Sequence, residues 1–448
     1  MNDSGLMAAS VAQHSGLRWG VVAVFAVVYL GMFLGGLPRL KLDRAGVALL
    51  GAIAVIGLGA VSVEEAARAV DLPTVLLLFA FMVMSAQMRL GGFYTATVRW
   101  VGGQRLSPTA FMAALIAVAA LLSAVFSNDV ICLAMTPVVA RICLQRGLNP
   151  VPFLVGLACA ANIGSAATLI GNPQNMLIGS VLKLPFADHL RQALPPVLLS
   201  LGVLWAWLAL GPQRHALAVG GDGAAAGGVG VPPSPTADQA PAAVPAPAPS
   251  DGEPVFDPVQ TAKGLLVAGA VLVAFVASSW PHEVVALVAA GVLLLSRRFH
   301  SSDVMGFVDW ELLVMFMGLF VVNHAFEQTG LAAEAVAVLA SQGIHLGQTG
   351  PLFAAGLLLS NLVSNVPAVM LLLPHVQGPG AAGAGLTLAL VTTLAGNLLL
   401  VGSIANLIVA DLAARQGITI DWKTHARIGI PVTLLTLAVV AGWLRWGV

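Results

Sequence analysis

The chain has 448 residues, of which 58% are hydrophobic and only 9% are charged, and its formal net charge is zero. A water-soluble protein carries roughly 25% charged residues, so this composition excludes an ordinary soluble domain and indicates a chain surrounded mostly by lipid. Zero net charge gives no indication of a nucleic-acid partner. The three cysteines, Cys132, Cys143 and Cys159, lack metal-ligand spacing and are predicted to be small buried side chains.

Ten apolar runs are long enough, or nearly so, to cross the roughly 30 Å of hydrocarbon in a bilayer. In chain order they cover approximately residues 20–37, 45–62, 72–88, 152–182, 195–211, 262–279, 283–297, 309–326, 384–412 and 428–446. The first run is not followed by a cleavage site and a polar mature domain, so we expect a span rather than a signal peptide. The sequence therefore predicts an all-α polytopic membrane protein with about ten transmembrane spans.

Residues 212–258 separate the fifth run from the sixth and are rich in Ala, Pro and Gly. Such a segment cannot bury enough apolar surface to offset the entropy of ordering it. We predict a disordered linker here, between a first transmembrane repeat at 1–211 and a second at 259–448.

The two halves of the sequence are internal repeats of each other. Three segments of the first half align, in the same order, with three of the second: Val70–Gly92 with Val308–Gly330, Leu122–Pro137 with Leu359–Pro374, and Thr168–Ile178 with Leu399–Val409. Each half holds five spans and one further segment around a Ser-Asn pair. Because five is odd, the second half enters the membrane from the opposite face, which gives two inverted-topology repeats.

The distribution of basic residues tests this topology. We place the N-terminus outside and treat each Ser-Asn segment as a re-entrant hairpin that returns to its own side. All lysines and arginines then lie inside except Arg18, Arg68, Lys183, Arg191 and Arg445. This bias follows the positive-inside rule and predicts a plasma (inner) membrane protein with both termini outside and a cytoplasmic linker.

Polar residues in mid-membrane are costly unless they face a cavity or a partner. They gather at two hairpin tips and at two interruptions of long helices, namely Ser127-Asn128-Asp129, Ser364-Asn365, Gly171-Asn172-Pro173 and Gly402-Ser403. Proline and glycine open a helix, and the two broken helices then expose carbonyls for a cation and helix N-termini for an anion. We predict one cavity lined by all four elements; the alternative is that these residues only pack helices together.

The acidic residues near these elements have different interpretations. Asp129, whose repeat partner is Val366, could bind a coupling cation or carry a proton, or it could cap the second hairpin arm. Asp71 and Asp309 each precede a span and are predicted to be N-caps.

At these residues the chain resembles the ion transporter superfamily, which includes divalent-anion/sodium symporters, citrate carriers and the arsenite/antimonite pump. SNDVICLAMTPVV is similar to the first hairpin of the arsenite-pump branch, and NIGSAATLIGNPQN, at Asn162–Asn175, is similar to the superfamily's broken-helix signature. SNLVSNVPAVMLLLP and GSIANLIVADLA resemble the second-half counterparts. The resemblance covers nearly the whole chain outside the linker.

The resemblance implies two cation sites with the substrate between the tips. One Na⁺ site would involve Ser127, Asn128 and Gly171, and the other Ser364, Asn365 and Gly402. The expected site also includes Asp129, Asn162, Asn172, Asn175, Asn397, Ser403 and Asn406. The dicarboxylate branch carries Ser-Asn-Thr at each tip, whereas Asp129 and Val366 stand here, so two carboxylate-binding hydroxyls are missing.

We therefore expect a secondary active transporter of a small anion or oxyanion, citrate/dicarboxylate-like or arsenite-like, that works by alternating access. Coupling would be to H⁺ or Na⁺, with no cofactor; the expected partners are the bilayer and a small inorganic or carboxylate anion, with a homodimer left open and no nucleic acid. A sodium/proton antiporter on the same scaffold is the main alternative. A channel or an intramembrane enzyme is disfavoured, because the inverted halves suit a carrier and no paired catalytic groups are visible.

Overall fold

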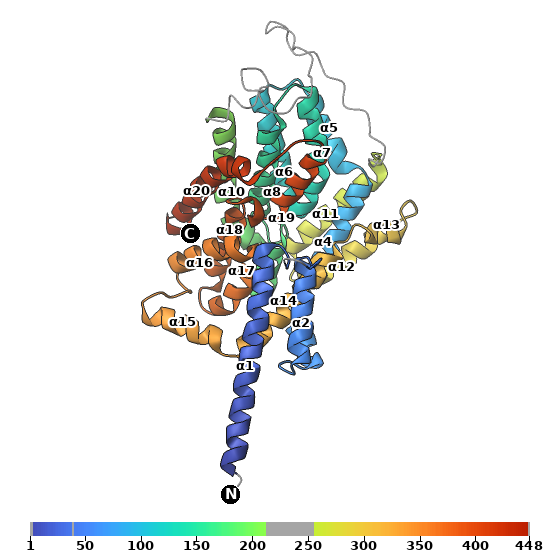
Figure 1. The fold of residues 1–448 in the computed structure, drawn as a ribbon. Coiled ribbons are helices and arrows are strands. Elements are labelled where there is room, and N and C mark those ends of the chain that lie inside the picture. The colour runs from blue at the N-terminus through green and yellow to red at the C-terminus, as the bar shows by residue number, and fades with distance from the viewer. Residues whose placement is uncertain (1–2, 38–39, 212–254, 447–448) are drawn as a thin grey trace.

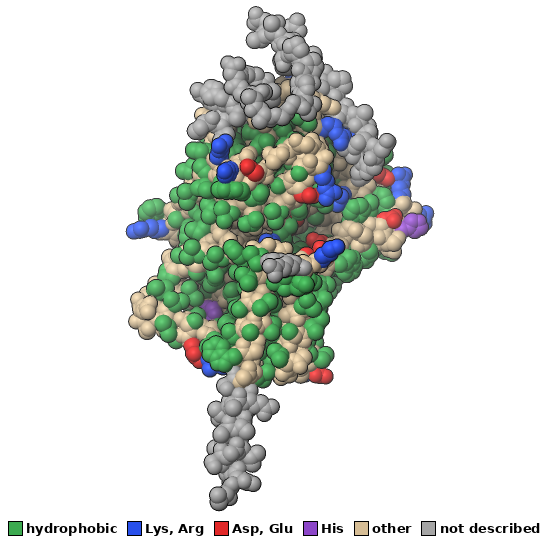
Figure 2. Space-filling view, in the orientation of Figure 1, with side chains coloured by type: hydrophobic (Ala, Val, Ile, Leu, Met, Phe, Trp, Pro, Cys, Tyr) green, Lys and Arg blue, Asp and Glu red, His purple; other side chains and the backbone are tan. Residues whose placement is uncertain are grey.

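The computed structural model describes residues 3–37, 40–211 and 255–446. Within these ranges every regular element is a helix and no strand occurs. Eight helices are long and apolar enough to cross a membrane, and shorter apolar helices of 10–17 residues accompany them. The face in Figure 2 is mostly hydrophobic, with charged side chains in a few small groups. The chain is thus an all-α integral membrane protein, as predicted; most of the predicted linker lies outside the described residues.

Ten helices make up the first half. They are α1 (Asp3–Leu34), α2 (Arg44–Gly57), α3 (Val63–Ala69), α4 (Leu72–Leu90), α5 (Phe93–Gly103), α6 (Pro108–Val125), α7 (Asn128–Gln145), α8 (Pro150–Ser165), α9 (Pro173–Val181) and α10 (Phe186–Leu210). The short helices α3 and α5 were not anticipated from hydropathy, because neither is long enough to span a bilayer.

The second half repeats this order element by element. It consists of α11 (Pro258–Ala277), α12 (His282–Leu294), α13 (Ser301–Met305), α14 (Trp310–Gln328), α15 (Leu331–Ser341), α16 (Thr349–Val363), α17 (Asn365–Leu372), the 3₁₀ turn η2 (Leu373–Val376), α18 (Ala381–Ala395), the 3₁₀ turn η3 (Leu400–Gly402), α19 (Ile404–Ala414) and α20 (Trp422–Trp446). The two α-helix series correspond one to one, α1 with α11 through α10 with α20.

The two repeats pack against each other through equivalent pairs of helices. Helix α2 packs on α14, and its counterpart α12 packs on α4, so the same contact is made twice across the interface. Helices α10 and α20 pack on each other. In Figure 1 the related helices α5 and α15 lie toward opposite ends of the molecule, as an inverted arrangement requires.

Polar caps define where several helices begin. The carboxylates of Asp71 and Asp309 accept hydrogen bonds from the backbone N–H groups of Thr74 and Leu312, each at 2.9 Å. Side-chain oxygens at this position satisfy N–H groups that have no partner in the first helical turn. The predicted N-cap role of both aspartates is confirmed.

Both re-entrant hairpins and both broken helices are present. Helices α6 and α7 form the first hairpin and α16 and α17 the second, while α8/α9 and α18/α19 are long helices interrupted at residues 166–172 and 396–403. Pro173 begins α9, where its missing N–H is not needed. The second tip is tighter, because Ser364 alone joins its two helices with a φ of 77°; such backbone strain in a non-glycine residue is typical of functional sites.

Candidate functional site

In the first repeat the hairpin tip touches the break of the broken helix. The backbone N–H of Asn128 donates to the Gly171 carbonyl at 3.2 Å. Gly171 has room for no side chain, since a Cβ there would lie 2.3 Å from the Ser165 oxygen and 2.8 Å from the Ser123 oxygen. Glycine is needed for this close approach, which brings carbonyl oxygens of the hairpin and the broken helix together.

In the second repeat the tip also touches the break, through a different glycine. A Cβ on Gly396 would lie 2.9 Å from Nδ2 of Asn365, so the second tip abuts the second break. Gly402 is equally crowded, because a Cβ there would lie 2.9 Å from the Gly396 oxygen. Asn128 and Asn365 are both buried.

In each repeat one asparagine side chain bonds to two backbone carbonyls at the break. The Asn175 side chain donates to the carbonyls of Thr168 (2.9 Å) and Ser165 (3.4 Å). Asn406, its repeat partner, donates to the carbonyls of Leu399 (3.2 Å) and Gly396 (2.9 Å). The two breaks are therefore stabilised by equivalent hydrogen bonds. These two predicted site residues fix the backbone of the breaks.

Asn162 is the centre of a hydrogen-bond network that joins the repeats. Its Oδ1 accepts from Asn128 Nδ2 (2.8 Å) and from the Ser403 hydroxyl (3.2 Å), and its Nδ2 donates to Asn397 Oδ1 (2.8 Å) and Asn406 Oδ1 (3.4 Å). Five of the predicted site residues thus meet at one buried point.

A second cross-repeat contact runs through Asn172, which caps α9 by accepting from the Asn175 N–H. Its Nδ2 donates to the hydroxyls of Ser165 (2.8 Å) and Thr393 (3.3 Å). Ser165 and Thr393 were missed in the sequence. Extending the repeat alignment would have found Thr393, because it falls opposite Asn162.

Several oxygens at the tips have no partner within the described part of the chain. They occupy equivalent places in the two repeats: Oγ of Ser123 and Ser360, and Oδ1 of Asn128 and Asn365. Buried polar atoms are normally hydrogen-bonded, so two repeated clusters of unpaired oxygens suit a cation with oxygen ligands.

Asp129 lies in the first turn of α7, next to Asn128, and within electrostatic range of Asp309. No N–H or O–H group of the described residues donates to its carboxylate. The capping interpretation of Asp129 therefore has no hydrogen bond to support it, in contrast to Asp71 and Asp309.

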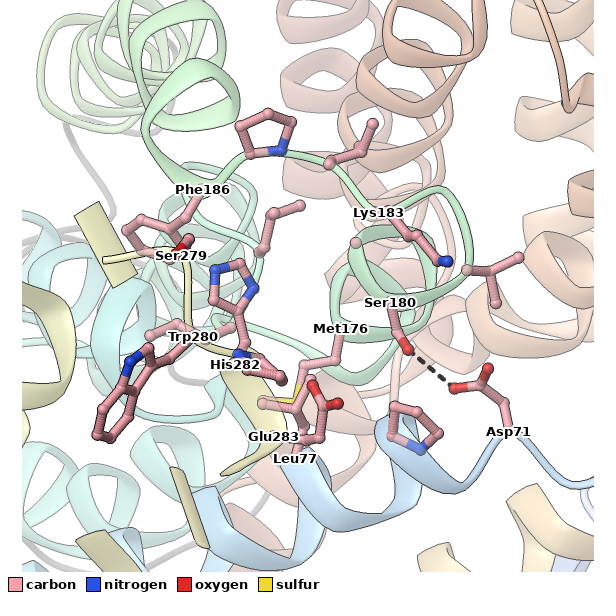
Figure 3. Close-up of a pocket in the computed structure, with 18 of the residues that line it drawn as sticks. Asp71, Leu77, Met176, Ser180, Lys183, Phe186, Ser279, Trp280, His282 and Glu283 are labelled. Carbon is pink, nitrogen blue, oxygen red and sulfur yellow. Dashed lines mark hydrogen bonds between the residues drawn. The ribbon is translucent and has the colours of Figure 1, made fainter. Parts of the chain in front are cut away.

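Two cavities related by the repeat flank the site. The α9 cavity has a volume of about 700 Å³ and the α19 cavity about 450 Å³. Equivalent residues line them: Asp71 and Asp309, Leu77 and Met315, Ile170 and Val401, Met176 and Leu407. In the α9 cavity the Ser180 hydroxyl donates to Asp71 at 2.9 Å, while His282 and Glu283 lie on the opposite wall (Figure 3).

The two cavities differ in how far they reach the break. Thr168 and Ile170 of the first break are buried, whereas their counterparts Leu399 and Val401 are 38% and 49% exposed. The second break thus has two exposed apolar side chains that the first lacks, while its polar residues Asn397, Ser403 and Asn406 are buried.

Inverted repeats, paired hairpins and broken helices that meet at a buried polar centre define a membrane transporter. Residues 21–395 match the family described as "Citrate transporter". The chain belongs to this family of membrane transporters. Its family and its named relatives are transporters rather than enzymes.

Named relatives agree with this assignment. The chain is 31% identical to the silicon efflux transporter LSI3 of Oryza sativa subsp. japonica, over 93% of this chain and 95% of that one. It is 30% identical to an uncharacterized transporter of Mycobacterium tuberculosis, over 94% and 99%. In fold it is similar to the crystal structure of the Alcanivorax borkumensis YdaH transporter, with a TM-score of 0.57 and 14% identity over 97% and 99% of the chains.

Proposed function

We propose that the protein is a secondary active transporter of a small oxyanion or its protonated acid, driven by a gradient of H⁺ or Na⁺. The observation that carries the proposal is the pair of equivalent sites where a hairpin tip meets a broken helix, each with unpaired buried oxygens. Two such sites around one polar centre suit a coupling cation and a co-transported or exchanged solute.

The coupling cation would bind at the tips. Ser127, Asn128 and Gly171 would form one site, and Ser364, Asn365 and Gly402 the other. The unpaired Oδ1 atoms of Asn128 and Asn365 are suitable hard-cation ligands. A proton would instead use Asp129, which has a carboxylate and no hydrogen-bond donor among the described residues.

The chemistry of the centre favours a compact, hydroxylated substrate. The hydrogen-bonding shell of Asn162 contains only amide, hydroxyl and carbonyl groups, and Asp129 adds negative charge nearby. For a di- or tricarboxylate this shell offers neither an arginine or lysine for charge-assisted bonds nor the two tip hydroxyls of the dicarboxylate branch. One relative is named for the efflux of silicon, an element that forms small oxyacids in water. The family description names citrate.

Alternating access would interconvert the two different conformations that the repeats have around their broken helices. Ser180 of α9 is bonded to Asp71 of the first repeat, while the related cavity at α19 leaves Val401 exposed. In the other state the first break would open and the second would close. With the expected topology, the α19 cavity faces the cytoplasm of an inner-membrane protein.

The test uses purified protein in proteoliposomes with silicic acid, arsenite, citrate and malate, each under an imposed Na⁺ or pH gradient. Uptake or efflux of an oxyacid that follows one ion gradient, with counterflow, supports the proposal. Transport of citrate alone would contradict the substrate assignment, and flux without counterflow would indicate a channel. Asp129 favours the second candidate, a sodium/proton antiporter, which would move Na⁺ against H⁺ with no anion present.

A further inference from the structure

Each repeat ends in a helix that carries the same motif. Helices α10 and α20 both have 25 residues, and each has histidine at its fourth position in a His-x-Arg-x-x-x-Pro pattern. The residues are His189, Arg191 and Pro195 in α10, and His425, Arg427 and Pro431 in α20. The histidines are therefore a repeated feature of the architecture, although they belong to none of the elements that form the centre.

Both histidines are buried and make the same bond. The Nε2–H of His189 donates to the Ala166 carbonyl at 3.3 Å, and that of His425 donates to the Asn397 carbonyl at 3.0 Å. Ala166 and Asn397 are repeat partners and stand where the first half of each broken helix ends. Carbonyls at a helix C-terminus lack an N–H four residues on, and the imidazole supplies this missing donor.

The surroundings show that the bond, rather than the volume of the ring, is what these positions provide. Nδ1 of His189 has no partner among the described residues, so the bond to Ala166 is the one that its imidazole makes there. A leucine would fill the space but would leave the Ala166 carbonyl without this donor. On α20 the approach depends on Gly429, where a Cβ would lie 2.4 Å from the Asn397 oxygen. Helix α20 thus has a glycine where the second break comes close to the His425 imidazole.

Short paths connect the histidines to the first hairpin tip. His425 holds the backbone of Asn397, whose side chain binds Asn162, which in turn binds Asn128. His189 holds Ala166 at the start of the break whose far end, Gly171, accepts the Asn128 N–H. Displacing either break would therefore move ligands of the centre.

We propose that His189 and His425 are positioning residues that hold the two breaks in the shape that binds ion and substrate. The role in ion and substrate binding rests on the proposed transport function; the fixing of the breaks does not. Neither histidine touches the centre, so each acts through the carbonyl that it binds.

The experiment compares His→Phe with His→Gln at each position in the full-length protein. Phenylalanine keeps the ring and removes the donor, whereas glutamine keeps an N–H that can reach the carbonyl. Hydrogen–deuterium exchange is measured at residues 166–172 and 396–403. We expect exchange to rise at least about fivefold in the break next to the Phe substitution, as for loss of one net hydrogen bond, and to stay near the wild-type rate in the Gln variant.

A second readout tests the link to binding. In proteoliposomes the Phe variants should raise KM for the transported solute about fivefold with little change in maximal rate, and the Gln variants should restore it. Gly429→Ala should reproduce the effect of His425→Phe, because its Cβ would lie 2.4 Å from the Asn397 oxygen and 2.8 Å from the imidazole Nε2 and would therefore push the two bonded groups apart. If a Phe variant does not reach the membrane, His→Asn takes its place, since asparagine is too short to reach the carbonyl.

Two outcomes would overturn the inference. One is unchanged exchange at the breaks in the donor-less variants, and the other is equal damage from Phe and Gln. If the wild-type protein transports none of the solutes but the exchange results hold, the proposed function fails while the role of the histidines in fixing the breaks stands.

Discussion

Replacing Asn162 by leucine keeps the volume of the side chain and removes the junction between the repeats. The substitution leaves the Asn128 amide and the Asn397 oxygen without the partners that now lie 2.8 Å away. Each buried polar group left unsatisfied costs about 1–3 kcal/mol, so these two groups alone cost about 2–6 kcal/mol. The longer bonds to Asn406 and from Ser403 are lost as well. Since 1.4 kcal/mol is a factor of ten, affinity at the centre should fall by at least about tenfold.

Thermal unfolding in detergent and solute binding by the same sample measure the effect. We expect a lower melting temperature together with the weaker binding, because the network links two halves of the fold. Asn162→Gln is the matched control. Its amide has the same oxygen acceptor for Asn128 and Ser403 and the same N–H donor for Asn397 and Asn406, one methylene further from the backbone, so its binding should lie between the wild type and Asn162→Leu.

An Asn162→Leu variant that melts and binds like the wild type would refute this reasoning. It would mean that Asn128 and Asn397 find other partners, or that the centre is not where the solute binds. A variant that melts lower but binds normally would confine Asn162 to a structural role.

Three further predictions concern coupling, conformational state and topology. A carboxylate in the membrane costs at least about 2.5 kcal/mol, so we expect Asp129 to be there for coupling rather than for stability. Asp129→Asn should then preserve membrane yield and melting temperature but abolish concentrative transport or flatten its pH profile. Accumulation with unaltered ion dependence would make Asp129 structural. Cysteines that replace Asp71 and Ser180, whose side chains are 2.9 Å apart, should cross-link in the present state. Cysteines at their repeat partners, Asp309 and Asp411, should cross-link only in the opposite state. Equal cross-linking of both pairs in one state would argue against alternation. Protease should cut the linker in inside-out vesicles and spare it in right-side-out vesicles, and the reverse pattern would invert the topology.

Local features of the chain were enough to predict the spanning helices, the hairpins and the breaks of this fold, although not its short helices. The low charge content and the apolar runs specify spanning helices, and the Ser-Asn tips and the Gly-Asn-Pro interruption mark where helices must turn or break. These signals are readable because proline, glycine and N-cap residues act on the backbone within a few positions of themselves. The repeated order of helices α1–α10 and α11–α20 follows from the internal sequence alignment for the same reason.

Other parts of the site depended on which residues meet across the repeats. Asn162 and Asn397 were predicted as site residues, but nothing in the sequence showed that they bind each other. Thr393 and the two histidines were missed, although His-x-Arg-x-x-x-Pro occurs in both halves. A hydrogen bond between residues more than two hundred positions apart, such as that of Asn162 with Asn397, depends on how whole helices pack. Periodicity along the chain shows which face of a helix is polar, and only the tertiary structure determines what that face contacts.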